Sequence, residues 1–346
     1  MQEWLMVAHR IPLPADAYVP ILKGKRAELD AVSGTPADKL VPLLEFLDPA
    51  SVAAQLTRAW KHPDDVVWIQ ALNADGADDA AFATALTDMF NSLRSDFRAV
   101  PVLTSTEEPA TLAAFSRIAA TDSRGVVLRI DVEELIDESI DSTADITATL
   151  SAVGMPESEV DLVLDAGLLT GSATIQSAVA LQAINELPHT NWRTIVVAFS
   201  AFPEAIGNVV PKNTVVAIPR IDAAAFTAVR RAAKLPLVYG DYAIGVPTYS
   251  DVAFTPIPNI RYASDAEWYI HRGRERANPS PQYRALARAL VAAPYYSGAA
   301  FSPGDQQIND VATETSGPGN ATTHLRAGMS RHLHLVLSRL ASLGVP

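Results

Sequence analysis

The sequence contains no cysteine among its 346 residues. Disulfides, thiolate zinc sites and cysteine nucleophiles are therefore excluded, and the composition fits a reducing cytoplasm, which is the location we expect. No apolar run approaches the roughly 20 residues of a membrane-spanning helix. Because no charged segment leads into an apolar run at the N-terminus, we also expect no signal peptide.

Positive charge is scarce in the first two thirds of the chain. Residues 1–219 hold 14 Lys and Arg against 30 Asp and Glu, a net charge of −16, whereas residues 220–346 hold 13 against 9, a net charge of +4. The acidic part predicts that there is no extended nucleic-acid surface. The basic C-terminal part either docks on the acidic part or faces an anionic ligand.

Short apolar segments led by a proline recur along the chain. They lie at residues 18–24, 40–45, 99–104 and 235–239, and most end in a polar residue or glycine. Such runs are typical of strands that are buried on both faces of a parallel sheet. Proline cannot donate a hydrogen bond to the sheet, so we expect each proline near the start of its strand and the polar residue at the carboxyl end.

The pattern predicts an α/β fold, a TIM-barrel-like (β/α)8 domain with a C-terminal β-hairpin and helix cap. Helical segments separate the expected strands, which are residues 18–22, 41–46, 66–71, 100–103, 126–130, 160–164, 194–199 and 237–239. Residues 214–218 are an alternative eighth strand. An open doubly wound sheet is the rival fold, but residues 23–26 form neither a dinucleotide fingerprint nor a phosphate loop.

Three regions follow from this assignment. We expect an N-terminal arm at 1–17, the barrel at 18–244 and the cap at 245–346. The cap is predicted to contain a hairpin of residues 259–263 and 267–271 and two helices, at 281–293 and 322–343.

Polar residues at the expected strand ends should converge on one mouth of the barrel. They are Lys23, Glu45, Gln70, Thr104, Arg129, Asp131, Asp165, Ser200 and Asp241. From these and the cap we select candidate catalytic residues, Glu45, Asp165 and Asp241, and candidate ligand-binding residues, Lys23, Arg129, Tyr242, Arg261, Arg272 and His332. The acids could supply a general base or hold Mg²⁺ or Ca²⁺, and a salt-bridged polar plug without activity is the alternative. No motif identifies a cofactor.

Two placements make the site prediction specific. Lys23 should lie between Glu45 and Asp241, with Asp165 across the mouth and Arg261 reaching in from a cap that folds over it. On the last helix, His332 borders the apolar stripe and His334 lies opposite, so His332 should be buried and His334 mostly exposed.

Several fragments, taken in order, resemble the Beta protein family of tailed bacteriophages and prophages. They are residues 18–25, 239–242, 260–262, 267–273, 301–305 and 326–332. Where that family tends to show a Trp-Arg pair and two adjacent histidines, this chain has Leu325-Arg326 and Arg331-His332. The resemblance implies a factor in conflict between phages, or between phage and host. It would act by binding a phage or host protein, or a small anionic ligand, at the barrel mouth and cap. The alternative function is a metal-assisted or acid–base hydrolase of a phosphorylated or nucleotide-like small molecule.

Overall fold

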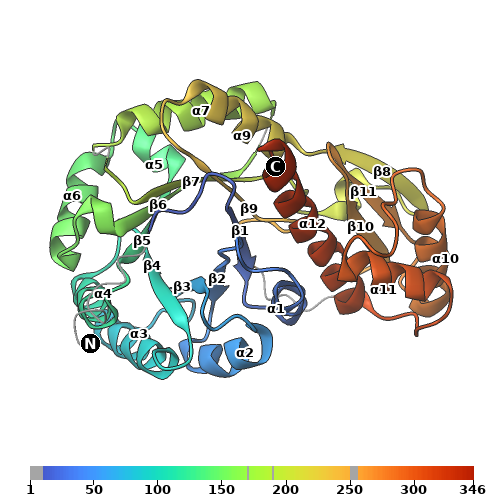
Figure 1. The fold of residues 1–346 in the computed structure, drawn as a ribbon, viewed down its shortest axis with the longest axis horizontal. Helices are drawn as coiled ribbons and strands as arrows, with labels where there is room; N and C mark the ends of the chain where they lie inside the picture. Colours follow the sequence, from blue (N-terminus) through green and yellow to red (C-terminus); the bar gives the residue numbers. More distant parts are fainter. Residues whose placement is uncertain (1–10, 170, 189–190, 250–255) are drawn as a thin grey trace.

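A computed structural model describes residues 11–169, 171–188, 191–249 and 256–346 (Figure 1). Eight parallel strands close into a barrel in the order β1-β2-β3-β4-β5-β6-β7-β9, which confirms the predicted fold. The strands are β1 (Tyr18–Lys23), β2 (Leu43–Phe46), β3 (Val66–Ala71), β4 (Arg98–Leu103), β5 (Val126–Asp131), β6 (Val160–Leu168), β7 (Thr194–Ser200) and β9 (Val238–Asp241). The segment around Leu237–Tyr239 therefore closes the barrel, as expected.

Helices surround the barrel on its outer face. They are α1 (Arg26–Ser33), α2 (Val52–Ala59), α3 (Asp79–Leu93), α4 (Pro109–Asp122), α5 (Val132–Ile136), α6 (Ser142–Val153), α7 (Ala173–Glu186) and α9 (Ile221–Ala232). Several begin at a side-chain cap, as α3 does at Asp78, whose carboxylate accepts from the Ala81 amide at 2.9 Å. Such caps satisfy amides that have no partner within the helix.

Alternation along each strand divides its side chains between two cores. One core fills the barrel with residues such as Val19, Ile21 and Trp68, and the other, containing Leu22 and Leu44, packs between the barrel and its helices. Residue parity in a strand therefore decides whether a side chain at the strand end faces the mouth or the helices.

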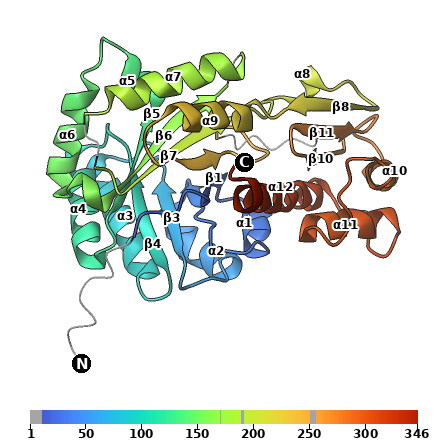
Figure 2. The same cartoon turned by 45° about the horizontal axis from the view of Figure 1, so that its top comes forward.

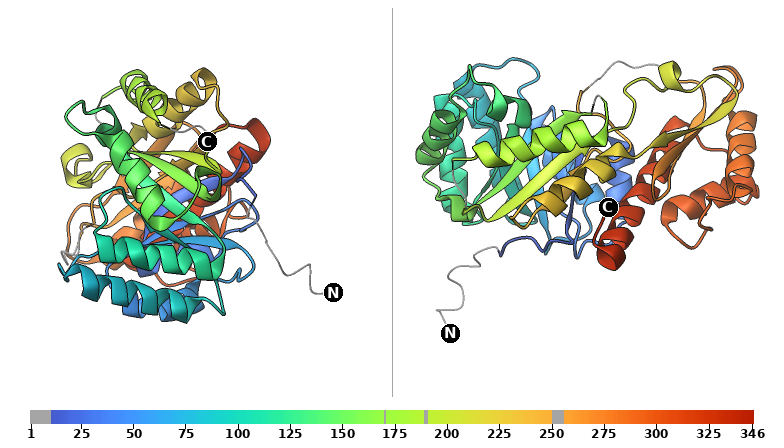
Figure 3. Two further views of the ribbon diagram at one scale, coloured as in Figure 1. Left: turned by 90° about the vertical axis from the view of Figure 1, so that its left-hand side faces the viewer. Right: turned by 90° about the horizontal axis from the view of Figure 1, so that it is seen from above.

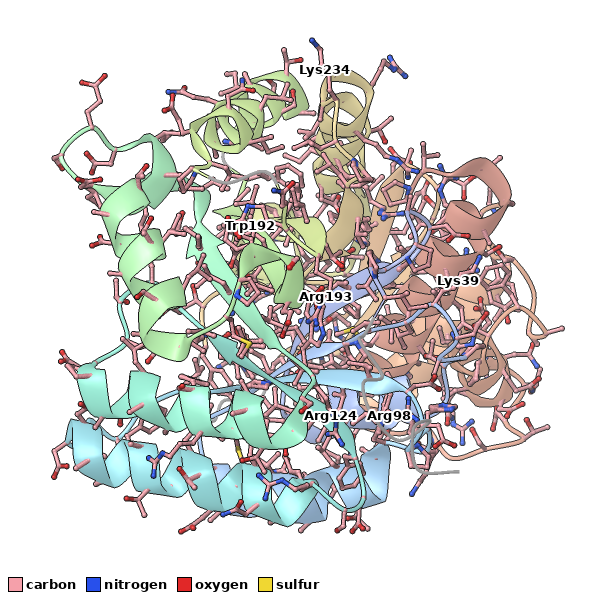
Figure 4. The ribbon with its side chains drawn as sticks, turned by 60° about the vertical axis from the view of Figure 1, so that its left-hand side comes forward. Lys39, Arg98, Arg124, Trp192, Arg193 and Lys234 are labelled. Atoms are coloured by element: carbon pink, nitrogen blue, oxygen red, sulfur yellow. The ribbon has the colours of Figure 1, made fainter. Side chains whose placement is uncertain are left out.

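The amino-terminal end of the barrel is closed by polar contacts. Leu13 of the N-terminal arm donates its amide to Thr194 Oγ1 at 3.1 Å. The Arg193 guanidinium holds both carboxylate oxygens of Asp161 at 3.0 Å, and Arg124 Nη1 donates to the Phe97 carbonyl at 2.9 Å. Figure 4 labels this end of the molecule by Lys39, Arg98, Arg124, Trp192, Arg193 and Lys234. Because Arg124 and Arg193 bind protein groups, we interpret both as structural.

The chain leaves the barrel twice to build the cap. After β7 it forms α8 (Ile206–Val209) and β8 (Thr214–Pro219), and after β9 it forms β10 (Asn259–Ala263), β11 (Glu267–Arg272), α10 (Pro279–Val291), α11 (Pro303–Ala312) and α12 (Ala321–Leu343). The predicted hairpin is β10–β11, and β8 adds to it as a third, antiparallel strand in the order β10-β11-β8. The elaborated connection around residues 214–218 thus belongs to the cap sheet.

The cap lies beside the barrel, not across its mouth (Figures 2 and 3). Helix α12 packs on α1 and β1, where it completes the outer ring of helices, and its other side packs on β10 and α11. The expectation that the cap folds over the mouth is therefore wrong. The physical reason is that the apolar stripe of α12, which includes Leu333 and Val336, is buried against the barrel wall.

Two further expectations need comment. Pro20 and Pro101 lie within β1 and β4, not at their first residues. Strand β1 begins at Tyr18 as expected, with Pro20 as its third residue, whereas β4 begins at Arg98, two residues earlier than expected. In the described ranges, no helix is both long and apolar enough to cross a membrane.

Candidate functional site: the polar ring at the barrel mouth

Six side chains form a connected polar ring at the carboxyl end of the barrel. We call this set the mouth ring, and its members are Lys23, Glu45, Gln70, Arg129, Asp165 and Tyr242. The register of the strands places these residues side by side, since Lys23 pairs with Glu45 across β1–β2 and Glu45 pairs with Gln70 across β2–β3. The five members that lie on β1, β2, β3, β5 and β6 each stand two residues after an apolar residue of the barrel interior, as Lys23 stands after Ile21. The structure thus brings together five of the predicted site residues, with Gln70 among the strand ends noted above.

Arg129 is the centre of the mouth ring. Its Nη1 donates to Glu45 Oε1 at 2.7 Å and to Gln70 Oε1 at 2.6 Å. Its Nη2 donates to Asp165 Oδ2 and to the Tyr242 hydroxyl, both at 2.6 Å. Burial opposes the charge on Arg129, but Tyr242, Asp165 and Glu45 outweigh it and raise its pKa above the ordinary value. The guanidinium is therefore a permanent cation that links three strands.

Tyr242 joins the ring from the residue after β9. Burial, together with the charge of Asp165, raises the pKa of its hydroxyl well above the usual value. The hydroxyl is therefore protonated and donates to Asp165 Oδ2 while it accepts from Arg129. Both acids of the ring are consequently engaged by donors from the protein itself.

Lys23 links the ring to the segment that follows β9. Its Nζ binds Glu45 Oε2 and donates to the Pro247 carbonyl at 2.5 Å. The same nitrogen lies 5.3 Å from the ring centre of Tyr249, and Lys25 Nζ lies 4.6 Å from it. Residues 245–249 therefore border the mouth on the side of β1, and both lysines are close enough for cation–π attraction.

One buried acid beside the ring escaped sequence reasoning. Glu28 of α1 is only 8% exposed, and its Oε2 has no hydrogen-bond partner among the described residues. Burial raises its pKa to about 8, although Lys23 and Lys25 act in the opposite direction. Its position on the helix could have indicated that it is buried, because Glu28 lies on the same face of α1 as buried Ala31 and Val32. At neutral pH this carboxyl is largely protonated.

Asp241 is not part of the mouth ring, so the predicted arrangement of Lys23 between Glu45 and Asp241 is wrong. In β9 the inward residues are Val238 and Gly240, and Asp241 therefore points toward the outer helices. Its carboxylate accepts from the Tyr18 hydroxyl at 2.5 Å and from the Tyr239 hydroxyl at 2.9 Å.

His332 binds Asp241 from α12. Its Nε2 lies 2.7 Å from Asp241 Oδ2, and the Trp268 indole donates to Nδ1 at 3.4 Å. Burial tends to raise the pKa of Asp241, but His332 and Tyr18 lower it below the ordinary value. The predicted burial of His332 is confirmed at 0% exposure. His334 is half-buried, more than expected, and its Nδ1 lies 2.8 Å from the Ser330 carbonyl.

The two cap arginines also lie outside the mouth ring. Arg261 Nη1 donates to the Ile244 carbonyl at 2.8 Å, its guanidinium lies 4.9 Å from the Phe202 ring centre, and burial lowers its pKa to about 10. Arg272 donates to the carbonyls of Gly207 and Val210 near the end of α8. Because the cap stands beside the barrel, these side chains reach neighbouring backbone and not the mouth.

The arrangement limits the available chemistry. Asp241 is separated from Glu45 and Asp165 by the wall of the barrel, so these three acids cannot share one cation. Within the described ranges, no group of three or more His, Cys, Asp or Glu residues has the geometry of a metal site. What the ring forms is a largely buried polar network in which two positive and two negative charges are paired.

The model of the Beta protein family matches residues 18–338, which include the barrel and most of the cap. No curated protein matches the chain.

Proposed function

The chain belongs to the Beta protein family, and from this premise we propose that it is a factor in conflict between phages, or between phage and host. It acts by binding a phage or host protein at the cap and the adjoining barrel mouth. The family resemblance suggests the biological setting, and the geometry of the mouth and cap supports a binding role.

The observation that carries the proposal is that both carboxylates of the mouth ring already accept hydrogen bonds from side chains of the protein. Glu45 accepts from Lys23 and Arg129, and Asp165 accepts from Arg129 and Tyr242. A general base must be free to accept a proton from its substrate, and a carboxylate that is fixed by a buried cation is poorly suited to that task. The ring is better suited to hold the mouth in one shape for a partner.

The cap supplies exposed apolar side chains on its outer strand. Strand β8 is an outer strand of the cap sheet, carries no charged residue, and exposes 48% of Val215. Val209 of the preceding α8 is 46% exposed. Uncharged outer strands are sites at which a further chain can pair, and exposed apolar side chains add to such contacts.

A hydrolase of a phosphorylated or nucleotide-like small molecule is the second candidate, and Glu28 is the observation that favours it. A carboxyl whose pKa is about 8 can donate a proton at neutral pH, and Lys23 and Lys25 lie near enough to affect it. In that function Glu28 is the general acid, and the lysines bind the anionic group.

Phage challenge separates the two candidates. Cells that express the chain are challenged with a phage panel, and the efficiency of plating is compared with that of cells without it. If the chain acts by binding, Val215→Lys abolishes protection, because a charge replaces the exposed apolar contact. Ile175→Lys is the matched control, since Ile175 is an exposed apolar residue on α7, 59% accessible and outside the cap. Glu28→Gln should retain protection. Loss in Glu28→Gln but not in Val215→Lys would refute binding and favour the hydrolase.

A further inference from the structure

Three of the family-like fragments meet within the cap, outside the mouth ring. Asp305 of α11 accepts from the Tyr262 hydroxyl at 2.8 Å and from Ser302 Oγ at 2.5 Å. Arg331 of α12 lies 3.7 Å from the same carboxylate. Gly304 allows this approach, because a Cβ on it would lie 2.0 Å from the Ala327 carbonyl oxygen. The fragments around residues 301–305 and 326–332 thus fix α11 against α12.

Residues of α1, α11 and α12 line a pocket of ≈ 280 Å³. Figure 1 shows how these three helices are arranged. The lining of the pocket includes Asp30, Gly34, Pro303, Gln307, Arg326 and Ser330. The volume lies at the small end of the range for ligand sites, so an occupant would be a compact molecule. The pocket is separate from the mouth ring and shares no residue with it.

Ser330 lines this pocket and carries an unpartnered hydroxyl. The residue is 3% exposed, and Ser330 Oγ has no hydrogen-bond partner among the described residues. A serine within a helix commonly donates to the carbonyl four residues earlier, but this one does not. A buried hydroxyl without a partner is costly, and a ligand group in the pocket would satisfy it.

The walls of the pocket carry opposite charges. Arg326 Nη2 donates to Gln307 Oε1 at 2.9 Å, which orients the guanidinium along α11. Asp30 has a weak ion pair with Arg26 at 3.6 Å, and the Arg26 side chain is 77% exposed. An exposed pair of this kind contributes little and can exchange for a better cation. The first turn of α11 also faces the pocket through Pro303 and Gly304.

We propose that this pocket binds a free amino acid, or a zwitterion of the same size. Its carboxylate is held by Arg326 and Ser330 Oγ near the first turn of α11. Its ammonium group is held by Asp30 on α1. Because the walls come from both the barrel and the cap, the bound molecule strengthens their junction.

Isothermal titration calorimetry of the full chain with a panel of L-amino acids tests the proposal, with acetate and ethylamine as single-charge probes. At least one amino acid should bind with a stoichiometry of one, more tightly than either probe. Ser330→Ala should weaken binding about tenfold, the effect of one hydrogen bond to a charged group. Asp30→Asn should weaken binding of the amino acid but not that of acetate.

A second variant, which fills the pocket, distinguishes loss of binding from loss of folding. A Cβ on Gly34 would meet Pro303 at 3.8 Å, an ordinary contact, so Gly34→Leu should occupy the pocket without disrupting its walls. It should abolish binding, whereas Gly317→Leu, at a position with open space around it, should leave binding unchanged. The proposal is overturned if no amino acid binds the wild-type chain, or if Gly34→Leu binds as the wild type does.

Discussion

Replacing Arg129 by Met tests how the mouth ring is held together. Arg129, Glu45 and Asp165 have side chains that are 13%, 4% and 11% exposed, so the substitution leaves two largely buried carboxylates without their shared cation. Breaking a buried ion pair in this way costs about 3–5 kcal/mol. Lys23 still contacts Glu45, which places the expected loss at the lower end of that range.

Urea denaturation followed by tryptophan fluorescence measures this loss, since the chain has 5 tryptophans. The exposed Arg117→Met on α4 is the control, and it should change the free energy of unfolding by less than about 0.5 kcal/mol. Adding Glu45→Gln and Asp165→Asn to Arg129→Met should recover part of the loss, because neither carboxylate is then left without its cation, and Lys23, the charge that remains, keeps the Pro247 carbonyl as its acceptor. A loss below about 1 kcal/mol in Arg129→Met, or a further loss in the triple variant, would refute the reasoning.

Two further predictions concern buried groups near the barrel. Because the pKa of Glu28 is raised from 4.5 to about 8, the folded chain binds more protons than the unfolded chain between these values, and this group makes stability fall as pH rises through that window. As pH rises through this window, Glu28→Gln should therefore gain stability relative to the wild type by up to about 1.4 kcal/mol per pH unit. Urea denaturation at several pH values measures this gain, and a difference independent of pH would contradict the raised pKa of Glu28. His332→Ala should destabilise the chain by about 2–3 kcal/mol, because it leaves Asp241 buried with one partner fewer, whereas His334→Ala should cost less than about 1 kcal/mol in the same assay; equal losses would contradict the assigned burial.

Much of the barrel was predictable because each of its strands is a local apolar run. The mouth ring was partly predictable for the same reason, since Lys23, Glu45 and Asp165 each end a recognisable strand. The partners of Arg129 could not be assigned in advance, because they come from strands that are distant in sequence.

The errors at Asp241 and in the cap have two different physical causes. Asp241 ends β9, but side chains alternate between the two faces of a strand. Its neighbours Gly240 and Tyr242 face the barrel interior, so Asp241 faces the outer helices. Strand β8 pairs with β11, whose residue Trp268 lies opposite Ile218. Local sequence does not encode such a distant pairing, so the place of β8 in the cap sheet required the structure.

The binding proposal is tested most directly by photo-crosslinking during infection. A photoreactive amino acid is placed at position 215 on β8, and at position 175 on α7 as the control. The proposal predicts an infection-dependent adduct of defined mass at position 215 that is absent at position 175. Identical adducts at both positions, or none at position 215 under conditions in which the chain protects cells, would contradict it.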